Sequence, residues 1–240
     1  MDAEQYDQWY ETPRGKWIGQ REVQMLVCNL TPRSHESVLD VGCGTGYFTR
    51  ELGRVMTGPI TGVDINPDWI QTARRKDPGR AVYQVADAQE LPFPTASVDL
   101  VVAITSLCFV ADFAKAVREM VRVARRRVAI GLLNRHSLLW LQKRRSSGTG
   151  SYQGARWHTV CEARRLFDGL PVTRTRVSTG IYVPSGGKFA QWIEPRWPQI
   201  VPIGAFILVV GDVFPERVDL SWSPCGNLDT RTYSPRDFGP

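Results

Sequence analysis

The sequence lacks the usual marks of a metal-binding, disulfide-stabilised or membrane-spanning protein. Its five cysteines are scattered without paired short spacings, which argues against a zinc site or a disulfide framework and favours a reducing compartment. The first residues are polar and acidic, unlike a secretory signal. The apolar run at 203–210 is too short to cross a bilayer. We therefore expect a soluble, cytoplasmic protein with no bound metal.

Strong charge is also missing. The formal net charge of +6 permits an acidic partner but does not require one. Basic residues cluster at 74–76, 125–127 and 143–145, and we interpret these clusters as solvated helix ends, where cations are favoured by the helix dipole. At 240 residues the chain is long enough for one domain with additions and a substantial core.

The most informative segment is a glycine-rich turn that follows a short apolar strand at 38–41. Its glycines are Gly42, Gly44 and Gly46, and a helix with one apolar face is predicted directly after them. Alternate glycines let the backbone bend sharply and approach a ligand closely. The free N–H groups of the following helix favour an anionic ligand group. The turn is not the NAD fingerprint, because Tyr47 stands where its third glycine is needed.

A second strand, at 60–65, contains Asp64 near its end. This acid lies about 20 residues beyond the glycine turn, the distance at which the second strand of a βαβ unit reaches ribose hydroxyls. A carboxylate there can accept hydrogen bonds from both hydroxyls, and Ile65 is placed to lie against an adenine ring. Asp64 as an ordinary strand-end acid, in another kind of nucleotide-binding α/β protein, remains the alternative.

Two motifs resemble those of the class I S-adenosylmethionine (SAM)-dependent methyltransferases: D-x-G-x-G-x-G at 40–46 and D-A-Q-E-L-P-F at 87–93. The likeness is to small-molecule members related to the quinone-biosynthesis C-methyltransferases. It implies SAM as cofactor, with its methionine part at the turn that begins with Asp40. It further implies that Asp87 accepts the adenine amine and that Ala88 contributes a backbone N–H. The opening YDQWYETPRGKW resembles the N-terminal cap that lies across the cofactor in this family.

The resemblance and the strand pattern together predict a Rossmann-like α/β fold. We expect a doubly wound, seven-stranded sheet that is mostly parallel, with an antiparallel C-terminal edge hairpin. The expected divisions are a cap segment at 1–35, a SAM-binding domain at 36–213 with a substrate-side insertion near 184–204, and a flexible tail at 214–240. Helices are predicted at 17–30 and 157–170, and a flexible segment at 146–150. The fifth strand is predicted at 128–132 and the last two at 172–183 and 205–210.

The fourth strand, at 97–104, runs into Thr105. Ligands of open α/β sheets lie beyond the carboxyl ends of the strands, so Thr105 and the loop to Phe109 are expected to face the reaction. The pattern fixes no catalytic residue. His136 and His158 follow the fifth strand and are candidates for proton transfer. Aromatic residues in the cap and in the 184–204 insertion predict a lid over a small, partly apolar substrate. The alternative is that these rings complete the core under long loops.

Three functions fit these observations. The first is methyl transfer to an unidentified small molecule. The second is methylation of RNA or protein, and the third is a SAM-binding regulator without catalysis. The loop after the fourth strand lacks the (N/D)-P-P-(Y/F) motif of base-modifying enzymes, which makes a nucleic-acid partner unlikely. The oligomeric state and the substrate stay open.

Overall fold

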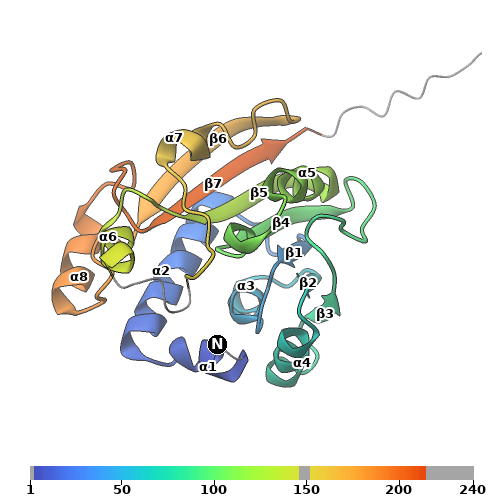
Figure 1. The fold of residues 1–240 in the computed structure, drawn as a ribbon. Coiled ribbons are helices and arrows are strands. Elements are labelled where there is room, and N and C mark those ends of the chain that lie inside the picture. Colours follow the sequence, from blue (N-terminus) through green and yellow to red (C-terminus); the bar gives the residue numbers. More distant parts are fainter. Residues whose placement is uncertain (1–2, 146–151, 215–240) are drawn as a thin grey trace, which may run out of the picture.

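One seven-stranded sheet forms the centre of the protein. The computed structural model describes residues 3–145 and 152–214 (Figure 1). Within it the strands have the order β3-β2-β1-β4-β5-β7-β6. Neighbours from β3 to β5 are parallel, and β7 is antiparallel to both β5 and β6. The strands are β1 Val38–Val41, β2 Ile60–Asp64, β3 Val82–Val85, β4 Val98–Ile104, β5 Ala124–Leu133, β6 Val172–Gly180 and β7 Phe206–Val213. The predicted fold class is therefore confirmed.

Helices cover both faces of this sheet (Figure 1). Helices α2 and α3 pack against the face that carries Val38 and Leu100, whereas α5 and α7 pack against the face that carries Leu39 and Val101. The helices are α1 Ala3–Trp9, α2 Pro13–Leu30, α3 Tyr47–Val55, α4 Pro67–Lys76, α5 Phe113–Val123, α6 Leu138–Arg145, α7 Val160–Arg164 and α8 Lys188–Ile193, with 3-10 turns at Leu107–Phe109 and Glu194–Arg196. The central strands are thus buried on both sides, which explains their continuous apolar sequences.

Local capping residues set where several helices begin. The Thr12 hydroxyl accepts a hydrogen bond from Gly15 N at 3.0 Å, and the following Pro13 occupies the first turn of α2. The Asn66 side chain caps α4 in the same way, accepting from Asp68 N at 2.9 Å. Within the described ranges, no helix combines the length and the hydrophobicity that a bilayer crossing requires.

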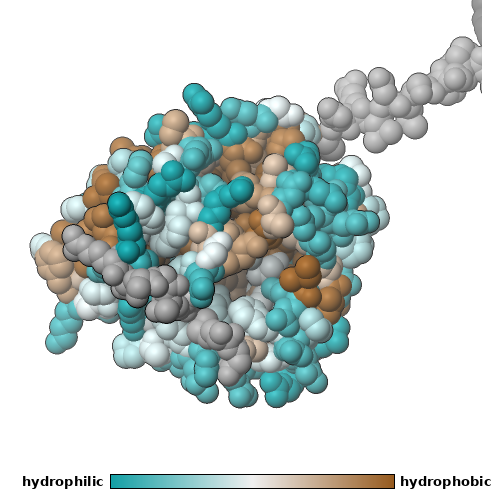
Figure 2. Space-filling view, in the orientation of Figure 1, coloured by the Kyte–Doolittle hydropathy of each residue, from teal (hydrophilic) through white to brown (hydrophobic). Residues whose placement is uncertain are grey.

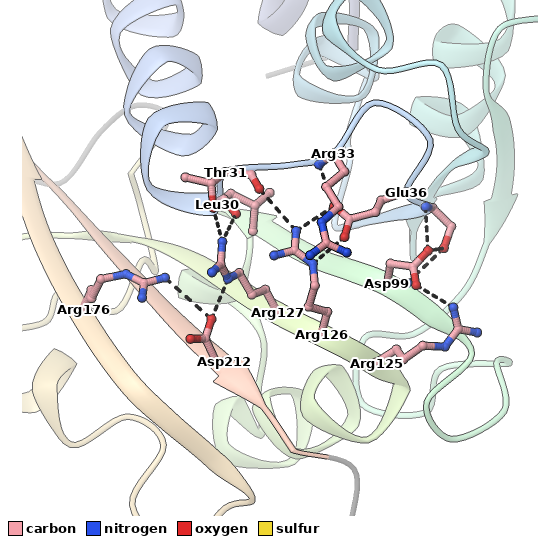
Figure 3. A network of polar contacts seen from close by, with 11 residues as sticks. Leu30, Thr31, Arg33, Glu36, Asp99, Arg125, Arg126, Arg127, Arg176 and Asp212 are labelled. Carbon is pink, nitrogen blue, oxygen red and sulfur yellow. Dashed lines mark hydrogen bonds and ion pairs between the residues drawn. The ribbon is translucent and has the colours of Figure 1, made fainter.

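The arginines at 125–127 are not solvated helix ends, so that interpretation is wrong. They lie in β5, and each pairs with an acid at 2.5 Å: Arg125 with Asp99, Arg126 with Glu36, and Arg127 with Asp212 (Figure 3). Arg127 also donates to the Leu30 carbonyl at the end of α2, at 2.7 Å. These contacts extend β5 beyond its predicted start and join the amino end of the sheet to α2. The basic cluster at 74–76 does lie in the last turn of α4.

The ends of several other helices and strands differ from those predicted. The helix predicted over 157–170 is only α7, and Phe167 reaches the core from a turn beyond it. The sixth strand ends at Gly180, and the seventh continues to Val213. The segment 146–150 and, apart from Phe214, the tail at 214–240 lie outside the described residues.

Candidate functional site

Most of the predicted site residues lie along the carboxyl ends of neighbouring parallel strands. The glycine turn after β1 is bonded to β2, with Gly42 N donating to the Val63 carbonyl at 2.7 Å. Gly44 N donates to Asp64 Oδ2 at 2.9 Å. On the other side, the Ser106 hydroxyl after β4 donates to the Val41 carbonyl at 2.8 Å. The turn is therefore fixed between the ends of β2 and β4.

The three glycines of the turn all have left-handed backbones, with φ of 70°, 56° and 82°. A Cβ at each position would come close to another side chain: 2.3 Å from Ser106 Cβ at Gly42, 3.0 Å from Trp69 Cε3 at Gly44, and 2.9 Å from the Tyr83 hydroxyl at Gly46. The sequence predicts that these glycines let the backbone approach a ligand. At Gly44 the nearest atoms belong to Trp69, and the left-handed backbone also favours glycine, so the protein's own structure accounts for glycine there.

Asp40 lies beneath the turn, with an exposed fraction of only 1%. Its Oδ2 accepts a hydrogen bond from the Thr49 hydroxyl at 2.6 Å. Burial raises the pKa of this carboxyl to about 7, and the Thr49 hydrogen bond partly opposes the shift. Asp40 thus ties β1 to α3 and supports the turn from below.

Asp64 is partly buried beside the turn. Its Oδ2 accepts from Gly44 N, and its Oδ1 accepts from Asn66 N, both at 2.9 Å. Burial raises the pKa of Asp64, while these backbone hydrogen bonds hold it down. Each carboxylate oxygen has a second lone pair for a ligand hydroxyl. The adjacent Ile65 is 66% exposed and presents an apolar side chain at the same edge; Figure 2 shows strongly hydrophobic surface near β3.

The predicted adenine segment follows β3. Ala86 N donates to the Asp64 carbonyl at 3.0 Å, which places Asp87 and Ala88 next to the end of β2. Asp87 Oδ1 accepts from the backbone N–H of Gln89 at 2.8 Å and from its amide at 3.1 Å. The Asp87 carboxylate is thus held in place by its own segment.

Thr105 stands at the end of β4 in a left-handed conformation, with φ of 55°. Its N–H donates to the Gly131 carbonyl at 2.9 Å, and its hydroxyl donates to the Ile104 carbonyl at 2.8 Å. Such backbone strain in a residue other than glycine clusters at functional sites. That this loop faces a ligand stays a prediction.

The two candidate histidines differ in surroundings. His136 is exposed, beside Thr159 and Pro202. His158 is buried with its ring 4.9 Å from that of Phe113, on the α5 face. Burial lowers the pKa of His158, and its Nδ1 has no hydrogen-bond partner among the described residues. Neither observation connects these rings with the glycine turn, and a catalytic role for either stays a prediction.

Sequence reasoning missed how α1 is held over the turn. Asp7 Oδ1 accepts from the Thr45 hydroxyl at 2.8 Å and from Arg50 at 3.0 Å, and Lys76 pairs with the other oxygen. The Tyr6 ring stacks on Trp69 with centroids 5.0 Å apart, above Gly44. The pairing of Asp7 with residues far along the chain leaves no local sequence signal.

Glu22 on α2 was also missed. Its residue is 8% exposed and lies on the buried face of α2, four residues after Ile18 and four before Leu26. An acid within an apolar helical stripe was the signal available in the sequence, since such a position normally carries a core side chain.

The doubly wound sheet, the glycine turn and the acid at the end of β2 form an arrangement similar to that of class I SAM-dependent methyltransferases. Residues 39–130 match the family model described as a methyltransferase domain. The match begins within β1 and ends within β5, so it spans the strand ends described above.

The chain is also similar to curated methyltransferases and to solved structures of methyltransferases. The chain is 37% identical over 113 residues to an O-methyltransferase of Penicillium expansum, covering 45% of this chain and 41% of the relative. It is 37% identical over 98 residues to the ubiquinone/menaquinone biosynthesis C-methyltransferase UbiE of Saccharophagus degradans, covering 38% and 39%. A SAM-dependent methyltransferase of Thermotoga maritima, described as a possible histamine N-methyltransferase, superposes with a TM-score of 0.72 at 24% identity, covering 88% of this chain and 96% of that one. The chain thus spans less than half the length of these two curated relatives, and the structural likeness shows the fold.

Proposed function

We propose that this protein transfers a methyl group from SAM to a small molecule. The observation that carries the proposal is the contact between Gly44 N and Asp64 at the carboxyl edge, with Ile65 exposed beside it. This arrangement offers a backbone turn, a ribose acceptor and an apolar adenine surface in one row. The raised pKa values of Asp40 and Asp64 also suit a cationic ligand, because a nearby positive charge stabilises their ionised forms.

In this proposal each part of the cofactor has its own residues. Gly42, Gly44 and Gly46 hold the methionine part over Asp40, and Asp64 accepts the ribose hydroxyls. The adenine lies against Ile65, with its amine on Asp87 and a ring nitrogen on the backbone N–H of Ala88, and Thr105 borders the methyl side. The cofactor supplies an electrophilic methyl carbon on a sulfonium, and the protein binds, orients and excludes water.

A small molecule is the acceptor class that the relatives favour. They include, besides the two named above, a malonyl-[acyl-carrier protein] O-methyltransferase of Serratia marcescens. The four cysteines in the described part of the chain are free thiols, which supports a cytoplasmic location for the reaction. RNA or protein methylation and a purely regulatory SAM-binding role are the competing functions.

Labelled methyl transfer separates these functions. The purified full chain and methyl-tritiated SAM are incubated in three separate reactions, with a small-molecule cell extract, with total RNA or with a denatured protein extract. Calorimetry measures SAM binding. We expect SAM binding and label in the small-molecule fraction only. Label confined to RNA or protein would favour the second function, and binding without transfer to any pool would favour the regulator.

The predicted lid gives a further expectation. Trp192 on α8 is exposed, with the Arg196 guanidinium 4.3 Å from its ring centroid, so it does not complete the core. Gly186, in the same insertion, lies against Arg14 at the start of α2. We expect Trp192→Ala to change the free energy of unfolding by no more than about 0.5 kcal/mol and to leave SAM affinity unchanged. Turnover should fall. Thermal melting, calorimetry and methyl transfer test this. The destabilising comparison is Trp17→Ala, since Trp17 on α2 is partly buried and packs against the core.

A further inference from the structure

Several large apolar side chains of the 184–204 insertion lie in solvent. Phe189 on α8 is 65% exposed, and Ile200 in the loop beyond α8 is 77% exposed. Trp192, Trp197 and Ile203 are exposed as well. The rings of Phe189 and Trp192 lie beside each other, with centroids 6.2 Å apart. Single exposed apolar residues are ordinary, but five within one short segment mark a contact surface.

Buried hydrogen bonds hold this segment in place. Glu194, directly after α8, is almost fully buried. Its Oε1 accepts from Ile181 N at 2.6 Å and from Arg21 Nε at 3.2 Å, and its Oε2 accepts from Tyr182 N at 3.0 Å. The carboxylate thus ties the end of α8 to α2 and to the chain directly after β6. The apolar side chains of α8 are therefore presented from a fixed position and not from a loose loop.

The apolar surface continues toward α6. His136, just before α6, lines the same pocket as Ile200. On α6 itself Leu138 and Leu141, one helical turn apart, are exposed. Figure 1 shows α6 and α8 at the same end of the molecule. We call the outer side chains of α6, α8 and residues 197–203 the α6–α8 surface.

The charge of this surface has one sign. The charged residues of α6 and of 184–204 are all basic, apart from the buried Glu194. Those without an ion-pair partner in the described part of the chain are Lys143, Arg144, Lys188 and Arg196. The Arg196 guanidinium lies 4.3 Å from the Trp192 ring centroid, so a cation and an aromatic ring are presented together. Such a surface fits a partner that carries negative charges over an apolar layer.

We propose that the α6–α8 surface docks the protein onto an anionic lipid membrane, an inference that does not depend on methyl transfer. Basic side chains are attracted to acidic headgroups at the bilayer surface. Aromatic and branched apolar side chains enter the boundary between headgroups and acyl chains. Because both kinds of side chain stand next to each other here, one contact with the bilayer satisfies both.

Two other occupants fit the surface less well. In a symmetric dimer of this chain the surface would meet itself, which would place basic residues opposite basic residues. An acidic protein would match the charge but would have to offer shaped pockets for side chains as exposed as Phe189 and Ile200. Fluid lipid accommodates protruding side chains in any arrangement.

Vesicle sedimentation of the purified full chain, without SAM, tests the proposal. The vesicles are phosphatidylcholine alone or an equal mixture of phosphatidylcholine and phosphatidylglycerol. We expect at least about 30-fold tighter binding to the mixed vesicles, since each basic side chain near an acidic bilayer contributes about fivefold. Added salt should reduce this preference. Equal binding to both vesicles, or binding to neither, would overturn the proposal.

Charge reversal locates the electrostatic part. Lys188→Glu combined with Arg196→Glu should bind the mixed vesicles at least about 30-fold more weakly than the parent. The matched control is Lys115→Glu with Arg118→Glu, at exposed positions on α5, and it should bind like the parent. An equal loss in both pairs would mean that overall charge, and not the α6–α8 surface, determines binding.

A second pair of variants locates the apolar part. Phe189→Ser with Ile200→Ser should weaken binding about tenfold or more, because two large apolar side chains no longer enter the bilayer. Val55→Ser with Val82→Ser, at exposed positions on α3 and β3, should bind like the parent. Thermal melting should be close to parental in all these variants, since the substituted side chains are exposed.

Two results would give the surface to another occupant. Parental vesicle binding by the Phe189 and Ile200 variant, with loss only on charge reversal, would overturn membrane insertion and favour an acidic protein. A dimer in sedimentation equilibrium that the same variant converts to monomer would assign the surface to a second copy of this chain. Neither result bears on SAM binding or methyl transfer, which the labelled-SAM experiment tests separately.

Discussion

Replacing Gly42 with alanine should destabilise the protein by roughly 2–5 kcal/mol. About 1–2 kcal/mol comes from placing a Cβ on a left-handed backbone with φ of 70°. About 1–3 kcal/mol more comes from overpacking, since the new Cβ would lie 2.3 Å from Ser106 Cβ. Ser106 cannot turn away freely, because its hydroxyl is bonded to the Val41 carbonyl. Urea unfolding should show a lower midpoint with an unchanged slope.

Gly169→Ala is the matched control for this substitution. Gly169 has φ of 78°, and an added Cβ there would meet nothing within 4 Å. It should therefore show only the left-handed backbone cost. Calorimetry at a temperature where both variants are folded should find SAM binding lost in Gly42→Ala and retained in Gly169→Ala. Equal destabilisation of the two would mean that the approach of Ser106 to the turn is not what requires glycine.

The second large effect is expected from Asp64→Ala. Loss of hydrogen bonds to a charged acceptor should weaken SAM by roughly 1–3 kcal/mol, or about 5- to 150-fold in Kd. The variant should also discriminate less against a 2′-deoxy analogue of SAM, because the ribose hydroxyl has lost its partner. Calorimetric titration with both ligands measures the two effects.

Asp64 also holds the glycine turn through Gly44 N, so its removal could act through the protein alone. Asp68→Ala, an exposed acid in the first turn of α4, controls for the lost charge and should bind SAM like the parent. Asp64→Asn keeps an acceptor for Gly44 and should be weakened less than Asp64→Ala. Parental affinity in Asp64→Ala would remove Asp64 from the ribose site.

The central parallel strands β1 and β4 were predicted well from the sequence because most of their residues are buried on both faces of the sheet. The run at 100–104, for example, is apolar throughout and can be recognised without knowledge of its partners. The weaker predictions concern elements whose extent depends on distant partners. Arg125, Arg126 and Arg127 were interpreted as a solvated helix end, yet they continue β5, where each pairs with an acid on another segment. The prediction at 157–170 failed for a similar reason, because some of the apolar residues at helical spacing pack against the core from turns and not from a helix.

The candidate site was predictable where function depends on strand ends. Asp64 and Thr105 could be placed because the topology of a parallel sheet brings its carboxyl ends to one edge. The partners that the glycines face could not be inferred, since Ser106, Trp69 and Tyr83 approach the turn only in the folded chain. Glu22 was overlooked for a related reason: α2 shows an acid in its apolar stripe, but only the folded chain shows that this position is buried.

The carboxylate of Asp7 gives the N-terminal helix an all-or-none character. Its three partners belong to the glycine turn, α3 and α4, yet all of them converge on one side chain. When that carboxylate leaves, the three contacts break together, so α1 detaches as a unit instead of fraying residue by residue. A ligand seated between α1 and the turn makes this detachment rarer. The rate of amide hydrogen exchange in α1 then reports directly on how much of the site is occupied by ligand, although α1 contributes no catalytic group to it.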